Sequence, residues 1–121
     1  MKTVSQDVID RLRNGSMSVD EIRQHLHDVG ALARCHAIEA MVGKVATNPE
    51  VLQEVVTAIV DPVNSTHILG TISVAHIGLK SLFGSSCESA RQAAKHLLAT
   101  WPLPDRDDLL WYLKSEGMSV D

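Results

Sequence analysis

Six histidines are the residues of this sequence best suited to bind a metal ion. Zinc sites need converging ligands, such as two histidines four residues apart on a helix or paired cysteines. The chain contains no HExxH or CxxC pattern, and His25 and His27 are two residues apart, so they point to different sides of a helix. His36 belongs to the next predicted helix. We therefore expect no metal site and no cofactor, and we interpret the histidines as solvated or hydrogen-bonded structural residues.

Nucleophilic catalysis requires a nucleophile and a base that face each other. Cys35 directly precedes His36, but neighbouring side chains on a helix diverge by about 100° and do not meet. No G-x-S-x-G, P-loop or G-x-G-x-x-G pattern occurs. The sequence therefore predicts no catalytic residues and a protein that is not an enzyme. Cys35 and Cys87 provide no disulfide framework, and we expect both to be reduced and not bonded to each other.

The C-terminal segment combines acidic with aromatic residues. Residues 100–121 carry five acidic and two basic side chains. Aromatic residues are enriched among interface anchors, and flanking charge steers association. We therefore predict that a partner is contacted here by Trp111, Tyr112, Asp105, Asp107 and Asp108. Two alternatives stay open: the carboxylates also suit a helix start, with Asp105 as its cap, and the helix at 105–115 can instead cover the end of the core.

The composition is that of an ordinary globular chain. Its 121 residues are 45% hydrophobic and 21% charged, which suits a single helical domain, 1–121, with a real core. A net charge of −4 argues against attraction to nucleic acid. Residues 1–12 lack the apolar stretch of a secretory signal, and the uncharged segment 62–79 is too polar to span a membrane. We expect a cytoplasmic protein with no membrane segment.

Helix signals occur along the whole chain, whereas alternating strand patterns and Asn-Gly or Asp-Gly turns are missing. A first helix includes Val4 and stops at Asn14-Gly15, and Ser18 with Glu21 fits a capping box for the second. Another capping box is expected at Ser85-Ser86-Cys87-Glu88. Seven helices are predicted, at about 4–14, 18–26, 31–46, 50–60, 65–83, 85–99 and 105–115.

The predicted helix at 65–83 is apolar on several faces. This is typical of a central helix surrounded by others, and an exposed patch for a partner or a second copy of the chain is the alternative. Small residues on this helix and on helix 31–46 predict that the two pack tightly against each other. These residues are Ala33, Ala37 and Ala40 on one side, and Gly70, Ser73, Gly78 and Ser81 on the other.

The segment from Leu26 to Val45 resembles a HEAT-type helical repeat. Its turn contains Asp28, and its second helix carries Arg34 followed by spaced alanines. The turn recurs at Val60-Asp61-Pro62, but His67 or Ala75 stands where the next arginine is expected. The resemblance covers about residues 18–99, as one good and two degenerate repeats, and registers of about 33 and about 41 residues both fit.

The resemblance implies an all-α fold, a short right-handed stack of antiparallel helical hairpins of the HEAT/armadillo type with about seven helices. It also implies protein binding, because such α-solenoids generally bind proteins through a helical face. We therefore predict a non-enzymatic interaction or scaffold domain whose partner is another protein, with a homo-oligomer as a further option. The alternative is a small helix-turn-helix-like DNA-binding regulator, in which residues 18–30 precede a recognition helix at 31–45. That helix offers only Arg34 and Lys44 as cations.

Overall fold

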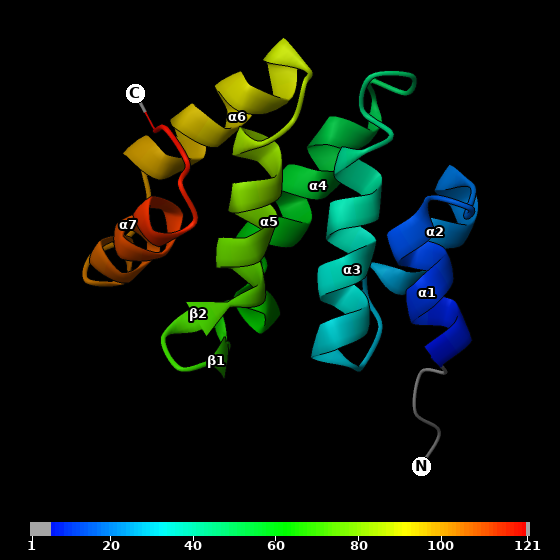
Figure 1. Cartoon of the computed structure of the whole chain (residues 1–121), viewed down its shortest axis with the longest axis horizontal. Coiled ribbons are helices and arrows are strands. Elements are labelled where there is room, and N and C mark those ends of the chain that lie inside the picture. Colours follow the sequence, from blue (N-terminus) through cyan, green and yellow to red (C-terminus); the bar gives the residue numbers. More distant parts are fainter. Residues whose placement is uncertain (1–5, 121) are drawn as a thin grey trace.

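The computed structural model describes residues 6–120 and is mostly helical (Figure 1). Val4, expected in the first helix, lies outside the described residues. The all-α class and the seven helices are confirmed for the part of the chain that is described. They are α1 Gln6–Asn14, α2 Val19–His25, α3 Ala31–Val42, α4 Val51–Val60, α5 Val74–Phe83, α6 Glu88–Ala99 and α7 Asp105–Ser115, and a short 3-10 helix, η1 Pro62–Ser65, follows α4.

Local sequence signals determine where the first two helices end and begin. Gly15 follows α1 with a φ of +77°, and the capping box of α2 is present: Ser18 Oγ accepts from the N–H of Glu21, whose carboxylate accepts from the N–H of Ser18. The second predicted capping box is wrong. Cys87 occupies the N-cap of α6 without a side-chain capping bond, and its N–H donates to Ser85 Oγ at 3.0 Å. The helix therefore begins at Glu88, later than expected.

The predicted helix from 65 to 83 is wrong in its first half. Strands β1 (His67–Leu69) and β2 (Ile72–Ser73) form an antiparallel hairpin, and α5 begins only at Val74. Leu69 pairs with Ile72 across a two-residue loop that starts with Gly70, whose φ of +59° interrupts a right-handed helix. The sequence pattern does not predict this hairpin for two reasons. Its apolar residues also fit helical spacing, and its turn begins with glycine instead of containing Asn-Gly or Asp-Gly.

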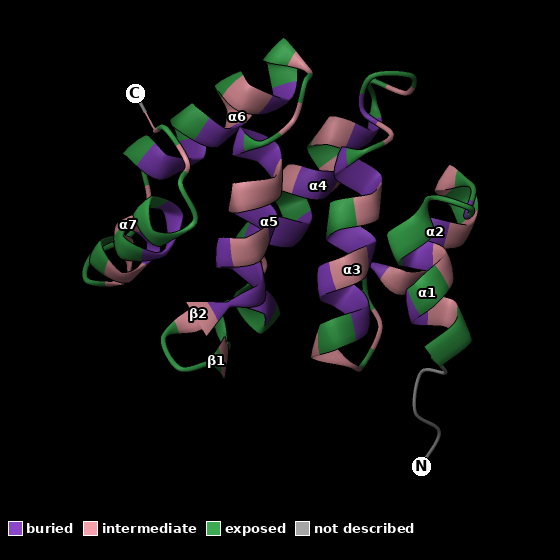
Figure 2. Cartoon of the chain, viewed as in Figure 1, coloured by how far each residue is buried: buried purple, intermediate pink, exposed green. Residues whose placement is uncertain are grey.

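The chain advances along the long axis of the molecule, from α1 and α2 at one end to α6 and α7 at the other (Figure 1). In the middle, α3 packs against α5, and α4 contacts both. Figure 2 shows buried residues along α3 and α5. Because α5 also contacts α6, α7, β2 and η1, it is the central helix that its apolar pattern predicts. None of the described helices has the length and apolar character needed to cross a bilayer.

Small residues allow the close approach at the centre. Ala33 and Ala37 are buried, and a Cβ added to Gly78 would lie 2.9 Å from Ile59 Cγ1 and 3.1 Å from Ile38 Cγ2. Both distances are shorter than the optimal carbon–carbon separation of about 3.5–4.0 Å. The expected tight packing of the two helices is confirmed where Gly78 of α5 meets Ile38 of α3. Gly70, assigned to the same helix by the sequence pattern, belongs to the hairpin.

The buried guanidinium of Arg34 connects two turns. Its Nε donates to Asn64 Oδ1 at 2.9 Å, and its Nη1 donates to the carbonyl oxygens of Asp28 at 2.8 Å and Val29 at 3.0 Å. Asn64, also buried, donates to the carbonyl of Ala58 at 2.8 Å. The α2–α3 turn is thereby fixed to η1, and Arg34 serves the packing of the molecule because its Nε and Nη1 donate to groups inside it.

Candidate functional site

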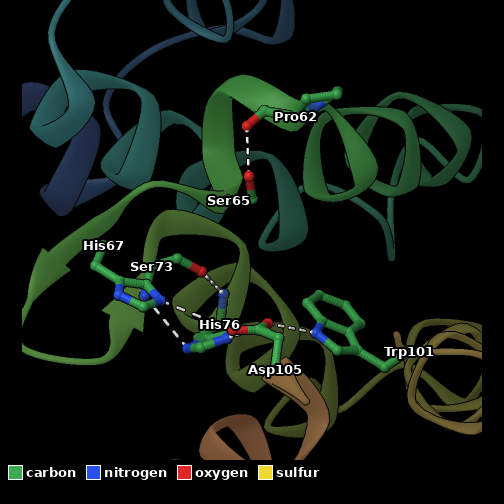
Figure 3. A network of polar contacts seen from close by, with 7 residues as sticks. All are labelled: Pro62, Ser65, His67, Ser73, His76, Trp101 and Asp105. Carbon is green, nitrogen blue, oxygen red and sulfur yellow. Dashed lines mark hydrogen bonds and ion pairs between the residues drawn. The ribbon is translucent and has the colours of Figure 1, made fainter. Parts of the chain in front are cut away.

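Asp105, the first residue of α7, lies at the centre of a polar network formed with the hairpin, α5 and Trp101 (Figure 3). Its Oδ2 accepts hydrogen bonds from His76 Nε2 at 2.8 Å and from Trp101 Nε1 at 2.8 Å. Its Oδ1 lies 3.8 Å from His67 Nε2. The expectation that Asp105 caps the last helix is wrong, because Pro104 occupies the N-cap and no side chain caps α7. The carboxylate instead joins three separate segments.

His76 is fully buried, and both nitrogens of its ring are engaged. Ser73 Oγ accepts from the N–H of His76, and His76 Nδ1 accepts from the N–H of Ser73, so histidine takes the place of glutamate in a capping box. Because Nδ1 accepts, the proton sits on Nε2, which donates to Asp105. With no free nitrogen to act as a general base, His76 holds Asp105 in position.

The carboxylate of Asp105 stays ionised at neutral pH. Burial opposes ionisation, but hydrogen bonds from Trp101 and His76, with the nearby rings of His76 and His67, lower the pKa of Asp105 below its ordinary value. The Asp105 side chain is 36% exposed. Since Oδ2 is held by two donors, Oδ1 remains available to a ligand.

A pocket of about 480 Å³ opens beside this network, with Trp101 and Asp105 in its wall. Its lining is mostly apolar and also includes two aspartates. The full lining is Ile59, Val60, Asp61, Ser65, Ala75, Leu97, Thr100, Trp101, Pro102 and Asp105. Val60 is 58% exposed, and Leu103, which follows Pro102, is 71% exposed. An apolar lining with a few polar groups that fix orientation is typical of binding sites.

Asp105 also belongs to a group of side chains that could hold a metal ion. His67, Asp105 and Asp108 each offer one ligand atom, and these atoms all lie within 4.8 Å of one another. Asp105 and Asp108 are three positions apart in the first turn of α7 and so share one face of the helix, while His67 comes from β1. Within residues 6–120, His67, Asp105 and Asp108 are the three potential metal ligands that the structure brings together.

The predicted partner-binding residues of α7 fall into different environments. Trp111 is 63% exposed and Asp107 is exposed, while Asp105 and Asp108 are half-buried. Tyr112 is only 8% exposed, and its ring stacks on His76 with centroids 6.4 Å apart, so it faces the core and is not available at the surface. The fully buried Leu109 and Leu113 anchor the same helix to the core.

The other sequence candidates do not assemble into a site. Burial raises the pKa of the Cys35 thiol to about 12, with a further contribution from the charge of Glu39, and His36 Nδ1 lies 2.9 Å from Glu39 Oε1. Arg34, one of two cations on the proposed recognition helix, is buried. A larger pocket of about 650 Å³ has charged side chains of both signs in its lining: Leu12, Arg13, Gly15, His36, Glu39, Ala40, Gly43 and Lys44.

Sequence reasoning missed the roles of His67, His76 and Trp101. On one continuous helix the two histidines would point in nearly opposite directions, because nine residues span about two and a half turns. In the structure His67 lies in the hairpin and not on the helix of His76, and the centroids of the two rings are 6.4 Å apart. Asp105 lies 29 positions after His76, so no local motif connects them. The one local signal was the Ser-x-x-His spacing at 73–76, a variant of the capping box.

Comparison with known proteins found no matching family, no matching curated protein and no matching solved structure. The function must therefore be inferred from the residues around Asp105, since a fold alone does not specify one.

Proposed function

We propose that this chain is a non-enzymatic interaction domain that binds a partner protein through the pocket beside Asp105. The observation that carries the proposal is the combination of an apolar lining with an ionised carboxylate in one surface pocket. Its volume of about 480 Å³ lies within the range of roughly 300–1,000 Å³ that ligand pockets span. Such a pocket suits the side chain of a partner segment.

The chemistry of the pocket indicates what that segment carries. Val60 and Trp101 offer apolar contact area, and Asp61 and Asp105 offer acceptors for a positively charged group. The acidic surplus of residues 100–121 adds a negative field that favours the approach of a basic partner. We therefore expect a large apolar side chain next to a lysine or arginine. Trp111, on the exposed side of α7, is the alternative anchor.

The arrangement of the helices supports the accompanying proposal of a HEAT-like stack. α2 contacts α3, α4 contacts α5, and α3 contacts α5, as expected when helical pairs share one core. Stacks of this kind present an extended face to a partner. With it we propose that the stack is right-handed, that its repeat is about 33 or about 41 residues long, and that the protein is cytoplasmic. Two free thiols, Cys35 and Cys87, agree with a reducing compartment.

Selection from a random peptide library on the immobilised chain tests the proposal. We expect enrichment of peptides that place leucine, phenylalanine or tryptophan beside lysine or arginine, and weaker binding at high salt because charges are screened. Thr100 is exposed and lines the pocket, so Thr100→Trp should block the pocket and abolish enrichment. Thr47→Trp is the matched control, because Thr47 is exposed and lies outside the pocket lining.

Enrichment that is lost in Thr100→Trp and kept in Thr47→Trp supports the proposal. Equal enrichment on the two variants, or no enrichment on the wild-type chain, contradicts it.

A further inference from the structure

We infer that His67, Asp105 and Asp108 form a binding site for a divalent first-row transition metal, with Zn²⁺ as the reference ion. One imidazole and two carboxylates are a ligand set that zinc accepts. The sequence patterns predict no such site because its ligands come from β1 and α7, far apart in the chain. The inference does not rest on the proposed partner binding, since the ion is held by the chain alone.

The distances require only a small closure around an ion. Zinc ligands lie about 2.0–2.2 Å from the metal, so two ligands of a tetrahedral site are roughly 3.4 Å apart. His67 Nε2 and Asp105 Oδ1 are 3.8 Å apart, and the three ligand atoms lie within 4.8 Å of one another. The side chain of His67 is 46% exposed at the start of a short strand, so its ring has room to turn towards the two carboxylates.

The carboxylate of Asp105 is already oriented for such a role. Trp101 and His76 both donate to Oδ2, which leaves Oδ1, 3.8 Å from His67 Nε2, free of these two donors (Figure 3). Metal-binding carboxylates in proteins are commonly held by outer hydrogen bonds of this kind. Little free energy would therefore be spent on ordering the Asp105 side chain when an ion binds.

Charge also favours a cation at this place. Two carboxylates and a neutral imidazole balance a divalent ion, and exposed Asp107 adds to the negative field. The N-terminal end of α7 carries partial positive charge, which opposes a cation, but only with about half an elementary charge. Imidazole as a ligand favours Zn²⁺, Co²⁺ or Ni²⁺ over Mg²⁺ and Ca²⁺, which prefer oxygen ligands alone. Three protein ligands leave a fourth position for water or a partner group.

Isothermal titration of the tag-free, full-length chain with Zn²⁺ tests the inference. We expect one zinc per chain. Trp101→Phe removes an outer hydrogen bond to Asp105 and should weaken zinc binding roughly tenfold or more. His67→Ala and Asp108→Asn each remove a direct ligand and should weaken zinc binding at least as much. His36→Ala is the control, because His36 also lies beside a carboxylate, that of Glu39, but outside this group. Melting curves without zinc confirm that each variant is folded.

A single zinc that is weakened by all three changes and unaffected by His36→Ala supports the site. Wild-type affinity in His67→Ala, or no saturable binding to the wild-type chain, overturns it. The peptide selection is done in EDTA and the zinc titration without peptide, so either proposal can fail while the other holds.

Discussion

At the scale of single residues, the two thiols have opposite environments. Cys35 is buried in α3, and burial, with the charge of Glu39, raises its pKa to about 12. Cys87 precedes α6, where hydrogen bonds from the Ser89 side chain and from the N–H of Ala90 lower the pKa of its thiol. Both thiols are free, as the sequence predicts. Because the thiolate is the reactive form, these environments determine which cysteine reacts.

We expect iodoacetamide to alkylate Cys87 quickly in the folded protein and Cys35 only after denaturation. Because the pKa of Cys87 is lowered, its alkylation should stay fast at a pH below the pKa of an ordinary thiol. Ser89→Ala removes the hydrogen bond that lowers this pKa most and should slow the alkylation of Cys87 at neutral pH. Mass spectrometry of digested protein after timed exposure measures both sites. Similar rates at the two cysteines in folded protein would contradict the structure.

How far single residues could be predicted depends on whether their partners are local. The sequence places Asp105 at a helix start, which is correct, but not its bond to His76, because this bond arises only when α5 and α7 come together. The bond from Trp101 comes from four positions earlier in the chain, in the segment that joins α6 to α7. The sequence predicts Tyr112 as a partner contact because tryptophan and tyrosine are enriched among interface anchors. The structure shows instead that Tyr112 faces α5 and is buried, because adjacent side chains on a helix point about 100° apart and Trp111 takes the exposed side.

At the scale of elements, the contact between α3 and α5 depends on residues with small side chains. Gly78→Leu and Ala37→Leu should each overpack this contact and destabilise the fold by about 1–3 kcal/mol. The reason is that Gly78 has no room even for a Cβ, and Ala37 is fully buried. Urea unfolding monitored by circular dichroism measures the change, with Ala99→Leu, at an exposed position of α6, as the control. Parent-like stability of both core variants would rule out the observed packing.

An ion pair joins α2 to α4. Arg23 donates to Glu54 from Nε at 2.6 Å and from Nη2 at 2.9 Å, and the hydrogen bond from Arg23 lowers the pKa of Glu54. A lowered carboxyl pKa contributes stability that is present above the ordinary value and is lost as the pH falls through the value in the folded protein. The contribution is small because both side chains are partly exposed.

A double-mutant cycle of Arg23→Gln and Glu54→Gln should therefore show a small favourable coupling at pH 7 that is lost in acid, at a pH low enough to protonate Glu54, whose pKa in the folded protein lies below its ordinary value. Thermal unfolding of the four proteins at pH 7 and in acid measures it. Coupling that is unchanged in acid would mean that the charges do not interact.

The boundary between α1 and α2 was easier to predict than the hairpin. Ser18, Glu21 and Gly15 act within a few residues, so their effect is visible in the sequence. The hairpin at 67–73 is too short to show clear alternation, and it is supported by contacts of β2 with α5 and α7. Without those contacts in view, the apolar run fits a longer helix.

At the scale of the whole molecule, α7 is part of the hydrophobic core. Leu109 and Leu113 are fully buried in the same cluster as residues from α3 and α5. Truncation after Pro104 should therefore lower the melting temperature strongly or cause aggregation, because apolar surface is uncovered. Trp111→Ala should leave stability nearly unchanged, since Trp111 is exposed. A truncated chain that keeps its melting transition would show that α7 is not a cap.

The overall helical class could be predicted because helix signals are local and numerous. The order of packing could not, since it depends on which buried faces meet. Gly78 against Ile59 and Ile38 is an example, as three separate helices supply the contact. The pocket beside Asp105 is formed in the same way, from α4, α5, α6 and the segment that leads to α7.

The measurement that tests partner binding most directly is a ¹⁵N–¹H NMR titration with the most enriched peptide from the selection. The two tryptophans, Trp101 and Trp111, provide separate indole N–H signals at the two competing contact points. Trp101 lines the pocket and donates to Asp105, whereas Trp111 lies on the exposed side of α7. We expect the Trp101 signal to shift with the added peptide and the Trp111 signal to stay in place. A shift of Trp111 alone, or of neither signal, would contradict binding at the pocket.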